Sequence, residues 1–139
     1  AALDAALATG LPCGGWCPRG RRAEDGPIHE RYPLLETPSG RYAQRTEWNV
    51  RDSDGTLILT RGEPAGGTAL TRRLASRLGT PFLMLEPATP GAPAAAVEWI
   101  GREGIRTLNV AGPRESEAPG IHGQALEFLG RVLALSRDG

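Results

Sequence analysis

The chain has 139 residues, in which 16 basic side chains balance 16 acidic ones and 40% of residues are hydrophobic. This balance excludes the strongly basic surface that non-specific binding to nucleic acids or to anionic membranes requires. No apolar run reaches the roughly 18 residues of a membrane-spanning helix, and the first ten residues lack the basic and apolar regions of a signal peptide. We therefore expect one globular domain over residues 1–139, located in the cytoplasm.

Helical and strand-like patterns alternate along the chain. The first half predicts helices at 1–9 and 41–52, the second of them N-capped by Ser39, and strands at 13–17 and 56–60. A long irregular stretch at 18–39, rich in Gly, Pro and charge, lies between these elements. The second half predicts strands at 81–85 and 106–111 and helices at 68–78, 94–103 and 121–135. Gly10, Gly79 and Gly104 are the predicted stops of the helices at 1–9, 68–78 and 94–103. Such alternation indicates an α/β fold, a doubly wound and mostly parallel sheet with helices on both faces.

Composition adds two observations. All 16 basic residues are arginine, which reflects either a GC-rich genome or arginines that bind anions through their planar fork. The two cysteines, Cys13 and Cys17, have a spacing unlike common zinc or redox motifs, and two thiols cannot complete a structural zinc site. We expect reduced thiols and no metal.

The sharpest candidate site follows the strand at 56–60. In doubly wound sheets, ligands bind beyond the carboxyl ends of the strands. The segment RGEPAGGT at 61–68 lies there, between a buried strand and the start of a helix, and its candidate anion-binding residues are Arg61, Gly66, Gly67 and Thr68. The glycines allow close backbone approach, and the helix dipole favours negative charge. The alternative is a tight turn that needs glycine for its shape alone.

Two further segments contribute candidates. GPRES follows the last strand and offers Gly112, Arg114 and Ser116, although Arg114 could instead pair with Glu115 or Glu117 at the surface. In the helix at 41–52, Arg45 and Asn49 are four residues apart and share a face.

Two pairs of residues remain open to more than one interpretation. Asp52 and Asp54 serve either turn formation or ligand contact. Trp16 and Trp99 belong either to the core or to a stacking surface, and we expect the core.

Four ordered motifs carry a family resemblance. GGWCPRGRRAEDGPI, YAQRTEWNVRDSDGTLIL, GGTALT and LNVAGPRES resemble the putative molybdenum carrier family, a circularly permuted YpsA-like branch of the SLOG superfamily. The resemblance implies a Rossmann-like, three-layer, nucleotide-binding fold. Members of that family usually open with a strand and a GGQTGVDR-like loop before the AALDAAL helix. Since this sequence starts within that helix, we expect an N-terminally truncated chain.

The resemblance implies a binding protein for a phosphorylated small molecule, either a nucleotide or the molybdenum cofactor, and a homodimer or higher homo-oligomer. The implied ligand contacts are the candidates above, Arg45 included.

The alternative is an enzyme that cleaves an N-glycosidic bond in a nucleotide or an NAD-derived ligand, in the manner of the phosphoribohydrolases of the superfamily. There Arg45 would orient phosphate, and Glu47, Asp52 or Asp54 would stabilise developing positive charge. However, Arg72 or Arg73 stands about where the catalytic glutamate of those enzymes is expected.

Overall fold

Three parallel strands form the central sheet of the protein. The computed structural model describes residues 1–23 and 25–138, and the sheet has the order β4-β3-β5. These strands are β3 (Gly55–Leu59), β4 (Phe82–Leu85) and β5 (Leu108–Ala111). Every residue of β3 is buried, because β3 lies between the other two strands and is covered on both faces. An apolar, β-branched run is the sequence signature of such a strand.

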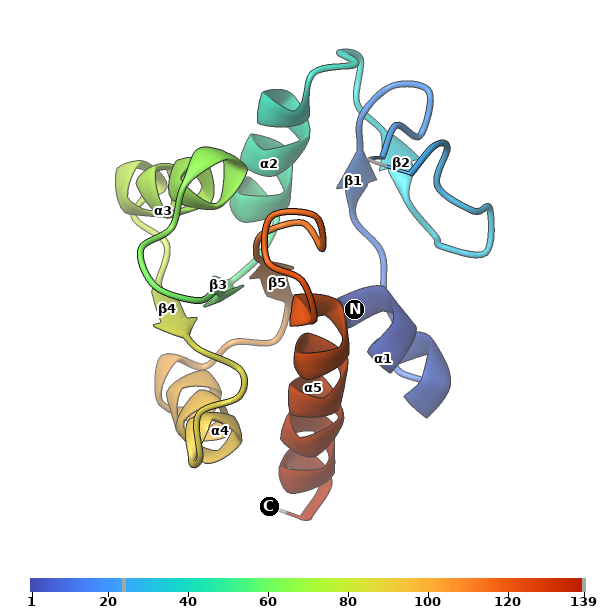
Figure 1. Ribbon diagram of the computed structural model, residues 1–139. Helices are drawn as coiled ribbons and strands as arrows, with labels where there is room; N and C mark the ends of the chain where they lie inside the picture. The colour runs from blue at the N-terminus through green and yellow to red at the C-terminus, as the bar shows by residue number, and fades with distance from the viewer. Residues whose placement is uncertain (24, 139) are drawn as a thin grey trace.

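Helices cover both faces of this sheet, as Figure 1 shows. On one side lie α2 (Tyr42–Arg51) and α3 (Gly66–Leu78), and on the other α4 (Ala92–Glu103) and α5 (Ile121–Asp138), with α1 (Ala2–Thr9) beside α5. Side chains alternate along a strand, so Leu57 and Leu59 face the α4–α5 layer, where they pack with Phe128 and Trp99. Val50 and Leu74 form a smaller cluster between α2 and α3. The predicted three-layer α/β architecture is confirmed.

The winding of the chain creates a crevice at one edge of the sheet. The loop after β3 leads into α3 on one face of the sheet, and the loop after β5 leads into α5, which packs beside α4 on the other face. The loops that leave β3 and β5 therefore diverge to opposite sides of the sheet. Ligands of doubly wound proteins bind where neighbouring strands send their connections apart in this way.

The strand predicted at 13–17 is shorter than expected and lies outside the central sheet. The structure has β1 (Trp16–Cys17), which pairs in parallel with β2 (Leu35–Glu36) in a separate two-stranded sheet. The Leu35 N–H donates to the Gly15 carbonyl at 2.9 Å. The strand β2 lies within the stretch predicted to be irregular, so the prediction missed it.

The glycines predicted to end the helices are correct, whereas the predicted N-cap of α2 is not. The predicted stops at Gly10, Gly79 and Gly104 are confirmed, and each has left-handed backbone geometry. Ser39 is not the N-cap of α2: Arg41 holds that position, and its N–H donates to the Ser39 hydroxyl at 3.0 Å.

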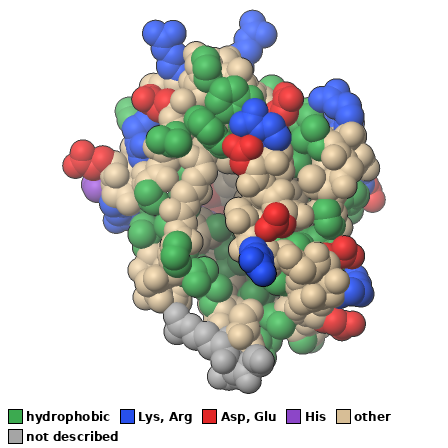
Figure 2. Space-filling model, turned by 180° about the vertical axis from the view of Figure 1, so that it is seen from behind, with side chains coloured by type: hydrophobic (Ala, Val, Ile, Leu, Met, Phe, Trp, Pro, Cys, Tyr) green, Lys and Arg blue, Asp and Glu red, His purple; other side chains and the backbone are tan. Residues whose placement is uncertain are grey.

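The surface agrees with the balanced composition. Acidic and basic side chains are interspersed on the face shown in Figure 2. Among the described residues, no helix is long and apolar enough to cross a membrane.

Candidate functional site

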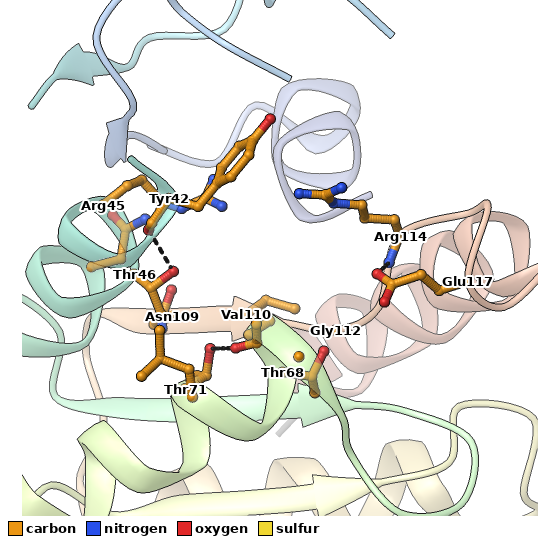
Figure 3. A pocket seen from close by; sticks show the side chains of 15 residues that line it. Tyr42, Arg45, Thr46, Thr68, Thr71, Asn109, Val110, Gly112, Arg114 and Glu117 are labelled. Atoms are coloured by element: carbon orange, nitrogen blue, oxygen red, sulfur yellow. Dashed lines mark hydrogen bonds between the residues drawn. The ribbon is translucent and has the colours of Figure 1, made fainter. Parts of the chain in front are cut away.

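A cavity of about 490 Å³ opens at the carboxyl edge of the sheet (Figure 3). It lies between α2, the N-terminus of α3 and the loop that follows β5. Its polar and charged lining consists of Tyr42, Arg45, Thr46, Asn49, Thr68, Thr71, Asn109, Arg114 and Glu117. The cavity therefore lies at the crevice that the winding of the chain creates.

Helix α2 presents one face to this cavity. Tyr42, Arg45, Thr46 and Asn49 recur at intervals of three, one and three residues, which places them on the same side of a helix. Guanidinium groups gather around the Tyr42 ring, with Arg22 at 4.7 Å, Arg114 at 4.8 Å and Arg45 at 5.4 Å from its centroid. Cation–π attraction holds each of these groups to the ring while leaving its N–H donors directed elsewhere. The result is a concentration of positive charge around the Tyr42 ring, which lines the cavity.

Arg45 carries the clearest electrostatic signal. Burial lowers the pKa of its guanidinium, and the neighbouring Arg114 cation lowers it further. Within residues 1–23 and 25–138, the Arg45 side chain has no hydrogen bond and no carboxylate partner, only its contact with the Tyr42 ring. A half-buried charge without a counter-ion is costly, and an anion in the cavity would offset that cost.

The N-terminus of α3 provides uncharged donors. Its first residue, Gly66, has φ +52°, and a Cβ at Gly67 would meet no atom within 4 Å, so the backbone there is open to the cavity. The first amides of a helix have no partner inside the helix and carry the positive end of its dipole. Thr68 is only 6% exposed, and within the described part of the chain its hydroxyl has no hydrogen-bond partner. It lines the cavity as an unused polar group.

The loop after β5 forms the opposite wall. A Cβ on Gly112 would collide with the carbonyl oxygen of Leu59, so only glycine fits this close approach between β3 and the loop. Further along, the Arg114 N–H donates to Glu117 Oε1 at 3.1 Å, which fixes the Glu117 carboxylate against the loop backbone. Figure 3 shows this carboxylate across the cavity from α2, whereas the Arg114 guanidinium reaches towards the Tyr42 ring on α2.

The structure brings most of the predicted site residues together. Six of them line the cavity: Arg45, Gly66, Gly67, Thr68, Gly112 and Arg114. The other two, Arg61 and Ser116, do not. Arg61 instead donates to Gln124 Oε1 at 2.8 Å and to the Pro119 carbonyl at 2.8 Å, which ties the end of β3 to the start of α5.

The carboxylates considered for catalysis lie elsewhere. Asp54 accepts the N–H groups of Arg106 and Thr107, and these bonds hold its pKa below the ordinary value. Asp52 pairs with Arg51 at 2.7 Å and accepts the Trp16 indole N–H at 2.8 Å. Neither these two nor Glu47 lines the cavity. Both aspartates hold turns and elements together, which was one of the two roles that their positions predicted.

The tryptophans and cysteines that the sequence analysis singled out have structural rather than ligand-binding positions. Trp99 is 4% exposed and belongs to the main core. Trp16 is half-buried and packs edge-to-face against Trp48, with ring centroids 4.7 Å apart. The Cys17 thiol is buried, which raises its pKa, and both Cys13 and Cys17 are free. In the part of the chain that the structure describes, no three His, Cys, Asp or Glu side chains gather as they would around a metal ion.

Sequence reasoning missed two residues that matter to the cavity. Tyr42 was detectable, since it is three residues before Arg45 on the helical face that also carries Asn49. Glu117 was expected only as an alternative surface partner of Arg114, and its place at the cavity had no signal because it depends on how the loop folds back onto its own backbone.

Comparison with known proteins agrees with this architecture. The model of the circularly permutated YpsA SLOG family matches residues 1–133. A crystal structure of a protein from Syntrophus aciditrophicus SB, named "Putative molybdenum carrier protein", superposes with a TM-score of 0.89 at 40% sequence identity. The match covers 94% of this chain and 85% of that one. No curated protein matches the sequence significantly. With its fold, its motifs and this match in agreement, the chain belongs to the circularly permutated YpsA SLOG family.

Proposed function

We propose that this protein binds a phosphorylated small molecule, either a nucleotide or the phosphate-bearing molybdenum cofactor, in the cavity between α2, α3 and the β5–α5 loop. The observation that carries the proposal is Arg45, a half-buried cation that lines the cavity with no carboxylate partner among the described residues. Charged groups taken out of water need a compensating partner. A phosphate group supplies that partner, and the arginine fork suits its geometry.

The N-terminus of α3 supports the same assignment. Amides at Gly66 and Gly67 and the Thr68 hydroxyl border the cavity, and helix N-termini favour anions by about 0.3 to 1 kcal/mol, or about 2 kcal/mol when partly buried. This alone gives weak binding. A charge-assisted hydrogen bond contributes about 1.5 to 3 kcal/mol, so Arg45 and Arg114 would provide most of the affinity.

Arg61 takes a different role from the one expected of it. Because its guanidinium holds Gln124 and Pro119, we assign it as a positioning residue that fixes the β5–α5 loop against the end of β3. Ser116, outside the cavity lining, has no assigned role.

Binding is better supported than catalysis. No carboxylate proposed for N-glycosidic cleavage lines the cavity, and the similar solved structure is named as a carrier protein. The cytoplasmic location and the homo-oligomeric state stay predictions.

Isothermal titration calorimetry tests the proposal, with a nucleoside 5′-monophosphate and a molybdopterin-type ligand titrated at low and high salt. Gly67→Glu should abolish binding, because it fills the open space and places a carboxylate where the phosphate belongs. Arg45→Ala should weaken binding by about 10- to 100-fold, Arg114→Ala by a similar factor and Thr68→Ala by less.

Matched controls separate charge from bulk. Gly67→Gln has nearly the size of the glutamate variant without its charge, and Arg41→Ala removes an exposed arginine next to α2 that does not line the cavity. We expect Gly67→Gln to retain part of the affinity and Arg41→Ala to match the wild type. Unchanged affinity in Gly67→Glu would mean that the segment is only a tight turn.

A further inference from the structure

Glu117 is the one acidic side chain among the residues that line the cavity as the structure describes it. Its presence is unexpected, since the same walls carry two arginines and the amino end of α3. A carboxylate in an anion site lowers the affinity for any plain anion by like-charge repulsion. Glu117 is exposed and bonded to its own loop, so water tolerates its charge without a ligand, but any anion in the cavity would meet this carboxylate.

The two carboxylate oxygens of Glu117 have different surroundings. Oε1 accepts the Arg114 N–H at 3.1 Å, which anchors the side chain. Oε2 faces the start of α3, where a Cβ on Gly66 would lie 3.9 Å away. Within the described residues no donor satisfies Oε2, and no cation forms an ion pair with the carboxylate. An acceptor is thus held beside the helix amides, directed at the place where an anion would bind.

We infer that Glu117 determines specificity by accepting a hydrogen bond from a hydroxyl or amino group next to the anionic group of the ligand. This inference rests on the proposed function. The preferred ligand class is then a phosphate ester with donor groups close to the phosphate, such as a sugar phosphate. Bare tetrahedral oxyanions, including inorganic phosphate and molybdate, bind less well because they have no donor to offer Glu117 in return.

The rest of the cavity wall suits such a ligand. Thr46 and Thr71 donate their hydroxyls to helix carbonyls at 2.9 Å, and each hydroxyl oxygen retains acceptor capacity towards the cavity. Asn109 adds an amide group from β5, whereas the amide of Asn49, which also lines the cavity, is bonded to the Trp16 backbone. Sites that hydrogen-bond a ligand hydroxyl discriminate strongly against analogues that lack it, because their own polar groups are then left unpaired.

The test compares ribose 5-phosphate, ethyl phosphate, inorganic phosphate and molybdate by calorimetry in the wild type and in Glu117→Gln. The amide keeps an acceptor for the Arg114 N–H but presents a donor to the start of α3. We expect wild type to bind ribose 5-phosphate at least about 10-fold more tightly than ethyl phosphate. In Glu117→Gln, inorganic phosphate and molybdate should bind about 5- to 10-fold more tightly and ribose 5-phosphate more weakly.

Glu63→Gln is the matched control, since it removes the same charge from the β3–α3 loop, has a side chain 92% exposed and does not line the cavity. It should leave the order of affinities unchanged. If Glu117→Gln binds all four probes in the same order as the wild type, the inference is wrong while the proposed function stands. If neither protein binds any probe at millimolar concentration, the inference is wrong, and the proposed function is wrong as well if the nucleoside 5′-monophosphate and the molybdopterin-type ligand also fail to bind. Should Glu117→Gln fold poorly, the wild-type preference for ribose 5-phosphate over ethyl phosphate decides the question.

Discussion

The central sheet with its helices and the small β1–β2 sheet are held together by different interactions. In the central region β3 is buried along its whole length, and Phe128 is 1% exposed against it. In the β1–β2 region, Leu35 is 64% exposed although Cys17 and Thr37 are buried, and many hydrogen bonds shape the surrounding loop. The Arg21 guanidinium alone donates to the carbonyls of Ile28, His29, Tyr32 and Leu34.

This difference shows where stability and recognition reside. Apolar burial, which is non-directional, stabilises the frame that fixes the ends of β3 and β5. Directional polar contacts shape the segment beside it, and Asn49 joins the two regions by exchanging hydrogen bonds with the backbone of Trp16 at 2.8 and 3.1 Å. The candidate ligand cavity lies at this border, since Asn49 also lines it.

The largest expected effect is in the apolar region. Phe128→Ala should lower the free energy of unfolding by about 3 to 5 kcal/mol, because it leaves a cavity beneath β3. Leu126→Ala, on the same helix but 37% exposed, should cost far less. Urea denaturation of both variants measures this. Equal losses would show that burial against β3 is not the main source of stability.

A smaller and local effect on stability should follow from removing the four hydrogen bonds that the Arg21 guanidinium donates. Arg21→Lys keeps the charge at a position with φ +52° but cannot reproduce the four hydrogen bonds. The amides of Leu35 and Thr37 should then exchange with solvent about 10-fold faster, while that of Leu57 keeps its protection. Hydrogen exchange measured by NMR tests this, with Arg19→Lys as the control. Faster exchange at all three amides would contradict the separation of the two regions.

The smallest effect concerns acid stability at the edge of the central region. Two backbone N–H groups hold the pKa of Asp54 below its ordinary value of 3.8. Its stabilising contribution is therefore complete well above that value and is lost as the pH falls through the lower native-state pKa. Asp54→Asn should reduce the loss of stability between pH 5 and strongly acidic solution. Urea unfolding at a series of pH values tests this against Glu98→Gln, an exposed control. An identical acid dependence in Asp54→Asn and the wild type would contradict the expectation.

The parts that were predictable from sequence are those that burial determines. The apolar run at 56–60 predicted β3 to within one residue, and the glycines after α1, α3 and α4 marked their ends. The strand β2 was not predictable, because two exposed residues paired through a few backbone hydrogen bonds leave no periodic pattern. Short strands of this kind depend on tertiary contacts that the local sequence does not encode.

The candidate site was predictable where the position of the backbone decides it, and not where the direction of a long side chain does. The position of a residue at a strand end indicates which edge of the sheet it occupies, and this correctly grouped Gly66, Gly67 and Gly112 at one cavity. The direction of a long side chain is a tertiary property. Arg61 follows β3 as expected, yet its guanidinium reaches Gln124, 63 residues away in sequence. Arg45 lines the cavity because the helical repeat of α2 fixes its face.

The tryptophans give each region its own optical reporter. Trp16 and Trp48 meet edge-to-face at 84° where β1 packs on α2, whereas Trp99, on α4, is buried in the main core. Two indoles this close couple their electronic transitions, so their near-ultraviolet circular dichroism reports whether the β1–β2 region is docked. In a Trp99→Phe variant, Trp16 and Trp48 would be the sole source of indole signal. Undocking of the β1–β2 region from α2 could then be followed without any attached label.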